Sequence, residues 1–423
     1  MGICQRLVDD FLATQGPDKS LKIIYTTRSS CKGSDTLKTL HSRLRRYHSS
    51  SQHNRIAFQP ENVELTNLLS VRDLAQKLNS SDLPKLDAII CNAGIGGWIG
   101  LDWFAAIPAI LAHIRTATVW PDYKLGTVGA ITRPQLSKSS HSDPEPPLGE
   151  VFCANLFGHY MLVHWLMPLL RACGPDAPAK IIWVSSIEPQ GYHFKSNDLQ
   201  GLRTDGPYEH SKRLTDILAL TSNCPASENA VTSFTSTEDT RPLRQMNSTP
   251  TQHVYHPGIV VTSVMSLYWI IHQAYLLGIY LARWVGSPWS TVEPYTAARG
   301  ATWLGLASNE EIRQAETDAH PFETKDTAPV VNGGRVKWGT AVNRIGKPTV
   351  RPTEVDKWGI TGSGTSFASK WWGGSSGLGR KPGAVEAKPE DVEDFVAEGA
   401  YAWQQMEELR RDWERRIKES ELI

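Results

Sequence analysis

The chain has 423 residues, of which 40% are hydrophobic and 21% charged, so it is long enough to bury a large core. Its 44 basic and 44 acidic side chains balance at neutral pH, so the charge does not point to nucleic acid as a partner. The 6 cysteines are scattered and predict neither a metal site nor a disulfide framework. Such cysteine usage favours a reducing compartment.

Strands and helices alternate through most of the chain. The predicted strands are residues 21–27, a short stretch within 55–65, residues 86–91, residues 181–184 and a strand that ends at 254–258. The predicted helices are residues 2–12, 36–47, 71–78, 151–170, 208–220 and 297–306. This alternation predicts βαβ units and a parallel sheet, in which ligands bind at the carboxyl ends of the strands. Arg28, Asn92 and Ser186 each lie at such an end.

Three segments interrupt the alternation. Residues 97–147 are long and mixed, and residues 222–250 are rich in Ser and Thr without a period, so we interpret both as insertions. Residues 264–282 contain no Asp, Glu, Lys or Arg and are about long enough to cross a hydrocarbon core. The apolar segment 264–285 therefore has two interpretations: a pair of membrane-contacting helices, or a buried lid over the substrate.

The end of the chain differs in composition from the rest. Residues 332–379 are rich in Gly and Trp and predict irregular structure, and residues 363–388 are interpreted as a Gly-rich linker. Residues 389–423 predict a charged amphipathic helix that either docks on the domain or binds a partner.

The centre of the predicted chemistry is Tyr208, which lies four residues before Lys212 at the start of an apolar helix. This spacing places both side chains on one helix face. A nearby ammonium lowers the pKa of a phenol, so Tyr208 is a candidate to exchange a proton with a carbonyl oxygen. Ser186, at the end of the preceding strand, can bond to the same oxygen. The pair alone also fits a surface tyrosine beside a lysine, and Asn155 alone also fits a satisfied core amide.

Several motifs occur in a fixed order along the chain. They are Asn92-Ala93-Gly94 after a strand, Asn155 in a helix, Ser186 after a strand, Tyr208 with Lys212, and His256-Pro257-Gly258. In this order the set resembles the short-chain dehydrogenase/reductases. The resemblance implies an α/β fold with a Rossmann-like, doubly wound parallel sheet in a domain of residues 1–362.

A narrower resemblance covers the chain to about residue 362. It is carried by residues 26–30, 61–71, 201–208 and 336–339. These stretches are similar to the fungal 3-keto-steroid reductases, which act in sterol C-4 demethylation during ergosterol synthesis. The wide gap between Ser186 and Tyr208 is also typical of that group.

The resemblance implies a role for each catalytic candidate. Tyr208 would protonate the C-3 carbonyl oxygen of a sterol ketone as hydride arrives from NADPH. Lys212 would lower the Tyr208 pKa and bond the nicotinamide ribose, and Ser186 would orient the ketone. Asn155 would hold a water that relays protons through Lys212.

The resemblance also places residues around the cofactor. They are Arg28, Glu64, Asn92, Ala93, Gly94, Lys212, Pro257, Gly258 and Thr262. Arg28 suits the 2′-phosphate and hence NADPH over NADH, whereas its alternative is an ordinary exposed arginine. Glu64 stands where many relatives carry an Asp directed at the adenine.

One departure from the family pattern concerns the start of the chain. The family opens with a strand and a Thr-Gly-x-x-x-Gly-x-Gly loop whose amides hold the pyrophosphate. Residues 2–7 look like the helix that follows these glycines, so the fold is expected to lack its first strand and glycine loop. We interpret the sequence as an incomplete record of a longer protein; the alternative is an impaired product.

The expected partners are a sterol ketone, a membrane surface and other enzymes of sterol C-4 demethylation, with no metal. The expected location is the endoplasmic reticulum membrane or the lipid droplet surface, with the catalytic domain facing the cytosol. A reductase of another hydrophobic ketone remains an alternative, as does a non-catalytic membrane scaffold for sterol-pathway enzymes.

Overall fold

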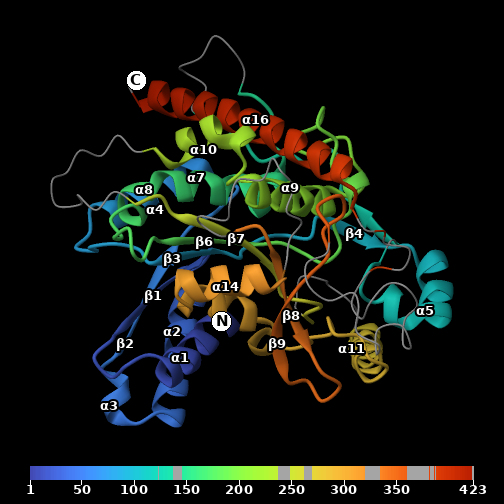
Figure 1. The fold of residues 1–423 in the computed structure, drawn as a ribbon, viewed down its shortest axis with the longest axis horizontal. Coiled ribbons are helices and arrows are strands. Elements are labelled where there is room, and N and C mark those ends of the chain that lie inside the picture. Colours follow the sequence, from blue (N-terminus) through green and yellow to red (C-terminus); the bar gives the residue numbers. More distant parts are fainter. Residues whose placement is uncertain are drawn as a thin grey trace.

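The structure of the chain is a computed structural model. It describes residues 1–121, 123–136, 145–236, 248–261, 269–319, 334–359, 381, 385 and 387–421. The strands are β1 (Leu21–Thr27), β2 (Ile56–Asn62), β3 (Ala88–Cys91), β4 (Trp98–Leu101), β5 (Lys124–Gly126), β6 (Lys180–Val184), β7 (Thr251–His256), β8 (Lys337–Val342) and β9 (Pro348–Pro352). They alternate with helices as the sequence predicts, and Figure 1 shows helices on both sides of the strands.

The helices of the amino-terminal half pack beside these strands. They are α1 (Gly2–Thr14), α2 (Ser30–Tyr47), α3 (Ser50–His53), α4 (Leu68–Asn79), α5 (Trp103–Ala117), α6 (Glu150–Phe152), the π-helical turn η1 (Cys153–Phe157), α7 (Gly158–Trp165) and α8 (Met167–Leu170). The predicted helix of residues 151–170 is therefore several helical pieces in succession. Pro168 is the second residue of the last of them, in the first turn, where a proline needs no hydrogen-bond partner for its nitrogen.

The carboxyl-terminal half adds further helices. They are η2 (Gly191–His193), α9 (Pro207–Thr221), η3 (Pro225–Ser227), α10 (Glu228–Thr235), α11 (Trp269–Trp284), α12 (Pro294–Ala297), α13 (Arg299–Leu306), α14 (Asn309–Ala319) and α16 (Pro389–Glu421). Helix α9 carries Tyr208 and Lys212 and is buried along nearly its whole length. It fixes the catalytic candidates to the core of the fold.

The main sheet contains five strands among the described residues, in the order β3-β6-β7-β8-β9. The first four are parallel, and β9 pairs with β8 in the antiparallel sense. Strands β6, β7 and β8 are buried throughout, as expected for strands covered by helices on both faces. The fold is therefore the α/β, Rossmann-like arrangement with a parallel sheet.

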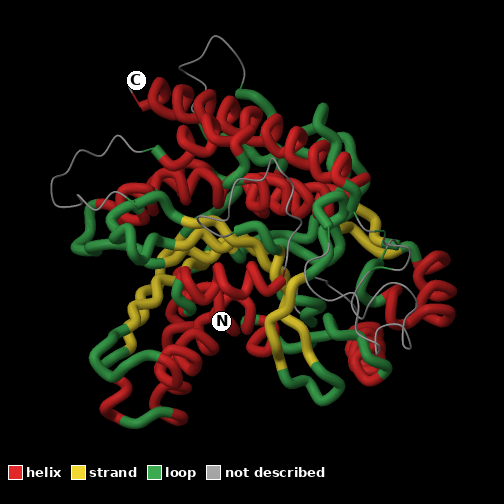
Figure 2. Tube along the Cα trace, viewed as in Figure 1, coloured by secondary structure: helices red, strands yellow, loops and turns green. Residues whose placement is uncertain are grey.

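Strands β1 and β2 form a separate parallel pair. Pro60 pairs with Tyr25 inside it, which is tolerated because β2 is an edge strand. Among the described residues no ladder joins β1 to β3. Figure 2 shows the strands in yellow among the helices in red. The β1–β2 pair is held by α1, α2 and a small apolar core that includes Val8, Phe11 and Ile23.

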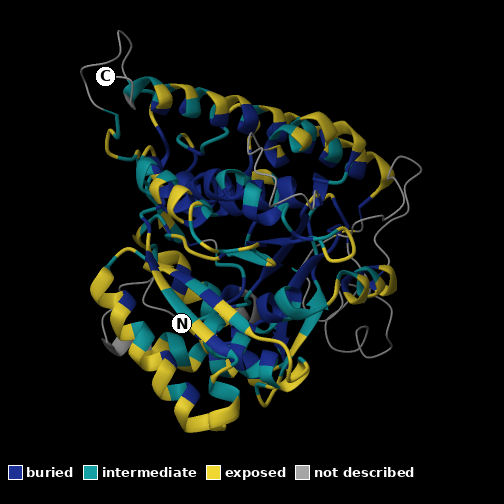
Figure 3. Ribbon diagram, turned by 90° about the vertical axis from the view of Figure 1, so that its left-hand side faces the viewer, coloured by how far each residue is buried: buried dark blue, intermediate teal, exposed yellow. Residues whose placement is uncertain are grey.

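Two hydrophobic layers cover the main sheet. On one face, a large core joins the sheet to α4, α7, α9, α10 and α16. On the other face, a smaller core joins Ile182 and Tyr255 to α13 and α14. Helix α16 runs across the outer layer, and Figure 3 shows its buried side toward the body of the protein. The apolar side chains of Phe395, Trp403 and Trp413 are fully buried, so α16 is a docked helix.

The structure corrects one prediction of irregular structure and shows a helix in one predicted insertion. Residues 332–379 contain β8 and β9, and β8 is a central strand of the sheet. Its polar residues did not predict a buried strand. In the structure these side chains have partners, because Lys337 pairs with Asp216 and Thr340 forms hydrogen bonds with Ala297 and Gly300. Residues 222–250 contain α10, whose Phe234 is fully buried. The predicted linker of residues 363–388 lies largely outside the described residues.

The insertion of residues 97–147 has a structure of its own. A two-stranded antiparallel hairpin, β4–β5, brackets helix α5. Helix α5 contacts α11, the described part of the apolar segment 264–285. Among the described residues, no helix is both long enough and apolar enough to span a bilayer.

Candidate functional site

The candidate residues gather at the carboxyl ends of neighbouring parallel strands. Asn92 follows β3, Ser186 follows β6 and Pro257 follows β7, and β6 pairs with both other strands. Their loops therefore meet at one edge of the sheet, where ligands bind in this type of fold. Helix α9 brings Tyr208 to the same edge, where its phenol lies close enough to the Ser186 side chain for Ser186 to lower the Tyr208 pKa.

The environment of Tyr208 reverses one prediction from the sequence. Burial raises the pKa of Tyr208 well above its ordinary value, the Glu188 carboxylate raises it further, and the hydrogen bond with Ser186 opposes them. The predicted lowering by Lys212 is therefore wrong for the structure described. The Lys212 ammonium lies 5.8 Å from the centre of the phenol ring, too far to outweigh burial and the nearby carboxylate.

Lys212 is fixed at the end of β6. Its Nζ donates a hydrogen bond to the carbonyl oxygen of Val184 at 2.8 Å. Burial lowers its pKa to about 8; Asp216, one turn further along α9, opposes this and Lys337 adds to it. The side chain is thus an ammonium near its titration range, aimed at the end of the strand that carries Ser186.

Asn155 lies in the π-helical turn η1, a deviation that is frequent at functional sites. Its Oδ1 accepts from the Ile95 amide at 2.7 Å, and its Nδ2 donates to the Ile95 carbonyl at 3.0 Å and to Ser211 Oγ at 3.1 Å. Asn155 therefore ties the loop after β3 to the catalytic helix. A Cβ on Gly94 would meet its Oδ1 at 2.5 Å, so this turn requires glycine.

The remaining cofactor candidates fall into two groups. At the end of β1, Arg28 Nη1 lies 3.9 Å from Glu64 Oε2, and both side chains are largely exposed. At the end of β7, Thr291 Oγ1 donates to the Pro257 carbonyl at 3.0 Å, and Gly258 adopts a φ of 75°. Ala93 also belongs to the edge, since its carbonyl lies 2.9 Å from the buried His159 Nε2. Thr262 lies outside the described residues.

Comparisons with known proteins establish the family. No family model matches the chain. The chain is 42% identical over 431 residues to a 3-keto-steroid reductase of Aspergillus fumigatus, covering 99% of this chain and 92% of the relative. It is 34% identical to a 3-keto-steroid reductase of Gibberella zeae, covering 98% of this chain and 91% of that relative. The chain belongs to the 3-keto-steroid reductase family.

The yeast member of this 3-keto-steroid reductase family, from Saccharomyces cerevisiae, is 27% identical and is covered over 71% of its length. Among solved structures, an NADPH-bound carbonyl reductase from chicken fatty liver aligns at 15% identity. The alignment covers 82% of this chain and 94% of the carbonyl reductase, with a TM-score of 0.37. So weak a likeness supports no conclusion about function, and the family membership rests on the sequence relatives.

Three charged residues beside Tyr208 escaped prediction. Lys124 of β5 forms ion pairs with Glu188 and Glu209, and its Nζ lies 5.3 Å from the centre of the Tyr208 ring. Trp98 of β4 contacts the same ring edge-on, with ring centres 4.9 Å apart. Glu188 and Glu209 lie close in sequence to Ser186 and Tyr208, so their positions could have suggested a place in the site. The sequence offered no such indication for Lys124, because it comes from the insertion.

Another cation supports Ser186 from the opposite side. Lys337 Nζ donates to the Ser186 carbonyl oxygen at 2.6 Å and to Asp216 Oδ2 at 2.6 Å. Lys337 stands in the Val336-Lys337-Trp338-Gly339 stretch that carried the family resemblance, so a signal for it was present. It links β8 to both the serine loop and the catalytic helix.

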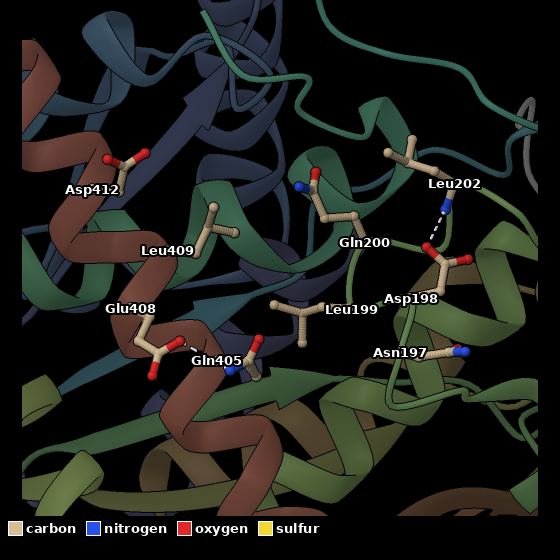
Figure 4. A pocket seen from close by; sticks show the side chains of 9 residues that line it. All are labelled: Asn197, Asp198, Leu199, Gln200, Leu202, Gln405, Glu408, Leu409 and Asp412. Atoms are coloured by element: carbon tan, nitrogen blue, oxygen red, sulfur yellow. Dashed lines mark hydrogen bonds between the residues drawn. The ribbon is translucent and has the colours of Figure 1, made fainter.

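A surface pocket lies away from this chemistry. It has a volume of about 400 Å³ and is formed by the loop before α9 and one face of α16. Figure 4 shows its lining residues: Asn197, Asp198, Leu199, Gln200, Leu202, Gln405, Glu408, Leu409 and Asp412. None of the predicted site residues lines it. Among the described residues, no group of three His, Cys, Asp or Glu is placed to hold a metal ion.

Proposed function

We propose that this protein reduces a 3-ketosteroid to the 3-hydroxysteroid with NADPH, in the C-4 demethylation of sterols during ergosterol biosynthesis. The observation that carries the proposal is that the Tyr208 phenol lies beside the Ser186 side chain at the carboxyl edge of the sheet, with Lys212 one helical turn away. The relatives named 3-keto-steroid reductase, matched over nearly the whole chain, supply the substrate class.

The residues at this edge fit a dinucleotide. The Asn92–Ala93–Gly94 turn is exposed after β3, and Gly94 lets its backbone lie close against Asn155. Arg28, also exposed, offers a guanidinium to a 2′-phosphate at the end of β1. Lys212 would hold the nicotinamide ribose, and the Pro257–Gly258 turn would border the nicotinamide. When bound, NADPH supplies the hydride that reaches the carbonyl carbon.

The side chains of the site would then transfer the proton to the ketone oxygen. The raised pKa keeps the Tyr208 phenol protonated at neutral pH, so it can donate to the ketone oxygen as negative charge develops there. The Ser186 hydroxyl, which lies beside the phenol, can turn its single hydrogen to donate a second hydrogen bond to the ketone oxygen. Asn155 holds the loop after β3 against α9 through Ile95 and Ser211. The water relay through Asn155 and Lys212 remains part of the proposal.

The decisive test compares Tyr208→Phe with wild type in NADPH-dependent reduction of a 3-ketosteroid. We expect a loss of about 10²–10⁴-fold in kcat, the size of a general-acid contribution. Tyr401→Phe is the matched control, because Tyr401 lies on the exposed side of α16. A Tyr208→Phe variant as active as the control would contradict the mechanism. Wild type that reduces other hydrophobic ketones but no 3-ketosteroid would contradict the substrate class.

We further propose that a strand and glycine loop preceding residue 1 fit between β1 and β3. Two features support this: the described strands divide into two sheets between β1 and β3, and β3 is less buried than β6, β7 or β8. Fluorescence titration of NADPH, on the chain as it stands and on a chain extended by such a segment, tests the idea. The idea is refuted if the chain as it stands, without the added segment, already binds NADPH tightly. Binding by neither would favour a scaffold role.

The proposal includes contact with a membrane surface from which a sterol is drawn, at the endoplasmic reticulum or a lipid droplet, with the site facing the cytosol. Helices α5 and α11 contact each other and expose large apolar side chains. Phe104 and Leu111 on α5 are 95% and 82% exposed, and Leu277 and Trp284 on α11 are more than half exposed. Such clustering is typical of membrane or protein contacts. Partner enzymes of the same pathway are proposed to assemble at this membrane.

Flotation with phospholipid vesicles tests the membrane contact. A Phe104→Ser/Leu111→Ser variant should lose binding, because both exposed apolar side chains are removed from one surface. Ile345→Ser is the control, since Ile345 is 87% exposed on the turn between β8 and β9. Equal flotation of both variants would refute the assignment of this surface.

A further inference from the structure

A buried cluster of three charges lies against the catalytic phenol. The ammonium of Lys124 forms ion pairs with both Glu188 and Glu209. The three side chains are 6%, 14% and 9% exposed. Lys124 Nζ also lies 4.3 Å from the centre of the Trp98 ring and 5.3 Å from that of Tyr208. The cluster therefore occupies the neighbourhood of Tyr208 with little water to screen it.

The fold holds this cluster in place through the β4–β5 hairpin. Lys124 pairs with Leu101 across the hairpin, two residues before Gly126. A Cβ on Gly126 would overlap the carbonyl oxygen of Asp205, so the hairpin lies directly against the start of α9. An insertion of the chain thus delivers a cation to the catalytic helix at a fixed position.

The charges in the cluster do not balance. One ammonium faces two carboxylates, which leaves one negative charge unless a carboxyl group takes a proton. Burial raises the pKa of Glu188 to about 7; Lys124 opposes this rise, and Glu209 adds to it. Glu188 is therefore the group of the cluster whose charge changes near neutral pH.

Two other titratable groups beside the cluster, His193 and Tyr275, keep their charge in that range. Burial lowers the pKa of His193, which faces Glu209, to about 4, so the imidazole is neutral. Burial, and then Glu188, raise the pKa of Tyr275 on α11 above its ordinary value. Lys212 approaches the phenol ring from its own helix, and its Nζ is bonded to β6.

We propose that Glu188, set by Lys124 and Glu209, is a positioning residue that keeps Tyr208 in its phenol form and so sets the pH range in which the site works. This inference rests on the proposed reductase function. Reduction needs a proton that moves from Tyr208 to the ketone oxygen while hydride from NADPH reaches the carbon. Alcohol oxidation needs the phenolate to take that proton back. A carboxylate beside the ring disfavours the phenolate by charge repulsion, so it extends reduction to higher pH and delays oxidation to higher pH.

The test uses Glu188→Gln, which keeps shape and removes the charge. Its matched control is Glu316→Gln, because burial also raises the Glu316 pKa to about 7 but Glu316 lies on α14. The assay is the pH profile of 3-hydroxysteroid oxidation with NADP⁺. In Glu188→Gln the rising limb should move to lower pH by about one unit or more. The falling limb of the pH profile of 3-ketosteroid reduction should move to lower pH by the same amount. The control should match wild type in both.

A second readout does not depend on turnover. In protein labelled with ¹³C at tyrosine Cζ, the Tyr208 resonance is the one missing from Tyr208→Phe. It should show an inflection near pH 7 as Glu188 ionises, present in wild type and Glu316→Gln and absent from Glu188→Gln. An active wild type whose Glu188→Gln variant keeps both the pH profile and the inflection would overturn this inference alone. A wild type that reduces no 3-ketosteroid would overturn the proposed function and this inference together.

Discussion

Replacing Lys337 by methionine should destabilise the protein through two partners at once. Lys337 is 2% exposed and Asp216 is 1% exposed, with 2.6 Å between Nζ and Oδ2, so the substitution leaves a carboxylate buried without its cation. Removing one partner of such a pair costs about 3–5 kcal/mol. This loss is a large share of the roughly 5–15 kcal/mol by which domains are stable.

The second partner is the Ser186 carbonyl, which accepts from the same ammonium at 2.6 Å. Removing Asp216 as well, in Lys337→Met/Asp216→Leu, should recover much of the loss, because a buried ion pair can be replaced by apolar side chains at little cost. A residual cost of about 1–3 kcal/mol should remain from the unsatisfied carbonyl. Catalysis should stay impaired in the double variant, since the loop that carries Ser186 has lost its anchor.

The assay is urea denaturation followed by circular dichroism, with Lys347→Met as the control. Lys347 lies exposed on the turn between β8 and β9, so its substitution should change stability by less than about 0.5 kcal/mol. The reasoning is refuted if Lys337→Met is no less stable than this control. It is also refuted if the double variant is as unstable as the single one, because the cost would then not come from an unpaired carboxylate.

Three further predictions test the hairpin, the docked helix and the catalytic lysine. Gly126→Ala should lower reductase activity by pushing the hairpin off α9, whereas Gly100→Ala, with open space around its Cβ, should not; steady-state kinetics decides. Trp403→Ala should cost about 3–5 kcal/mol in urea denaturation, whereas Trp284→Ala, at an exposed site, should cost little. Burial lowers the Lys212 pKa to about 8 in the folded state, so the unfolded state binds more protons between pH 8 and about 10.5. The stability of wild type should therefore rise over that range relative to Lys212→Met, as measured by denaturation at each pH.

The order of strands and helices could be predicted from the sequence because each element carries its own pattern. Strand β6 is a continuous apolar run, and α9 presents regularly spaced apolar positions after Tyr208. The catalytic candidates lie at the ends of these elements. Once the elements were predicted, Ser186, Tyr208 and Lys212 were therefore expected at one edge of the sheet. Strand β8 could not be predicted in this way, because its polar residues are paired with partners far away in sequence, such as Asp216 for Lys337.

The direction of the Tyr208 pKa could not be predicted for a related reason. Spacing along the helix correctly places Lys212 one turn from Tyr208, but it does not say where the ammonium points. In the structure that ammonium is bonded to the Val184 carbonyl, while Glu188 lies beside the phenol. Burial and charges from other segments set the direction of the Tyr208 pKa shift, and neither can be seen in a local sequence pattern.

The protonation of the site is therefore decided largely by residues outside the shared motif set. The hairpin insertion brings Lys124 to one side of Tyr208, where it holds Glu188 and Glu209. Strand β8 brings Lys337 to the far side of the serine loop, where it lowers the Lys212 pKa together with burial. Two proteins with the same Ser, Tyr and Lys can thus differ in the pH range of their reaction.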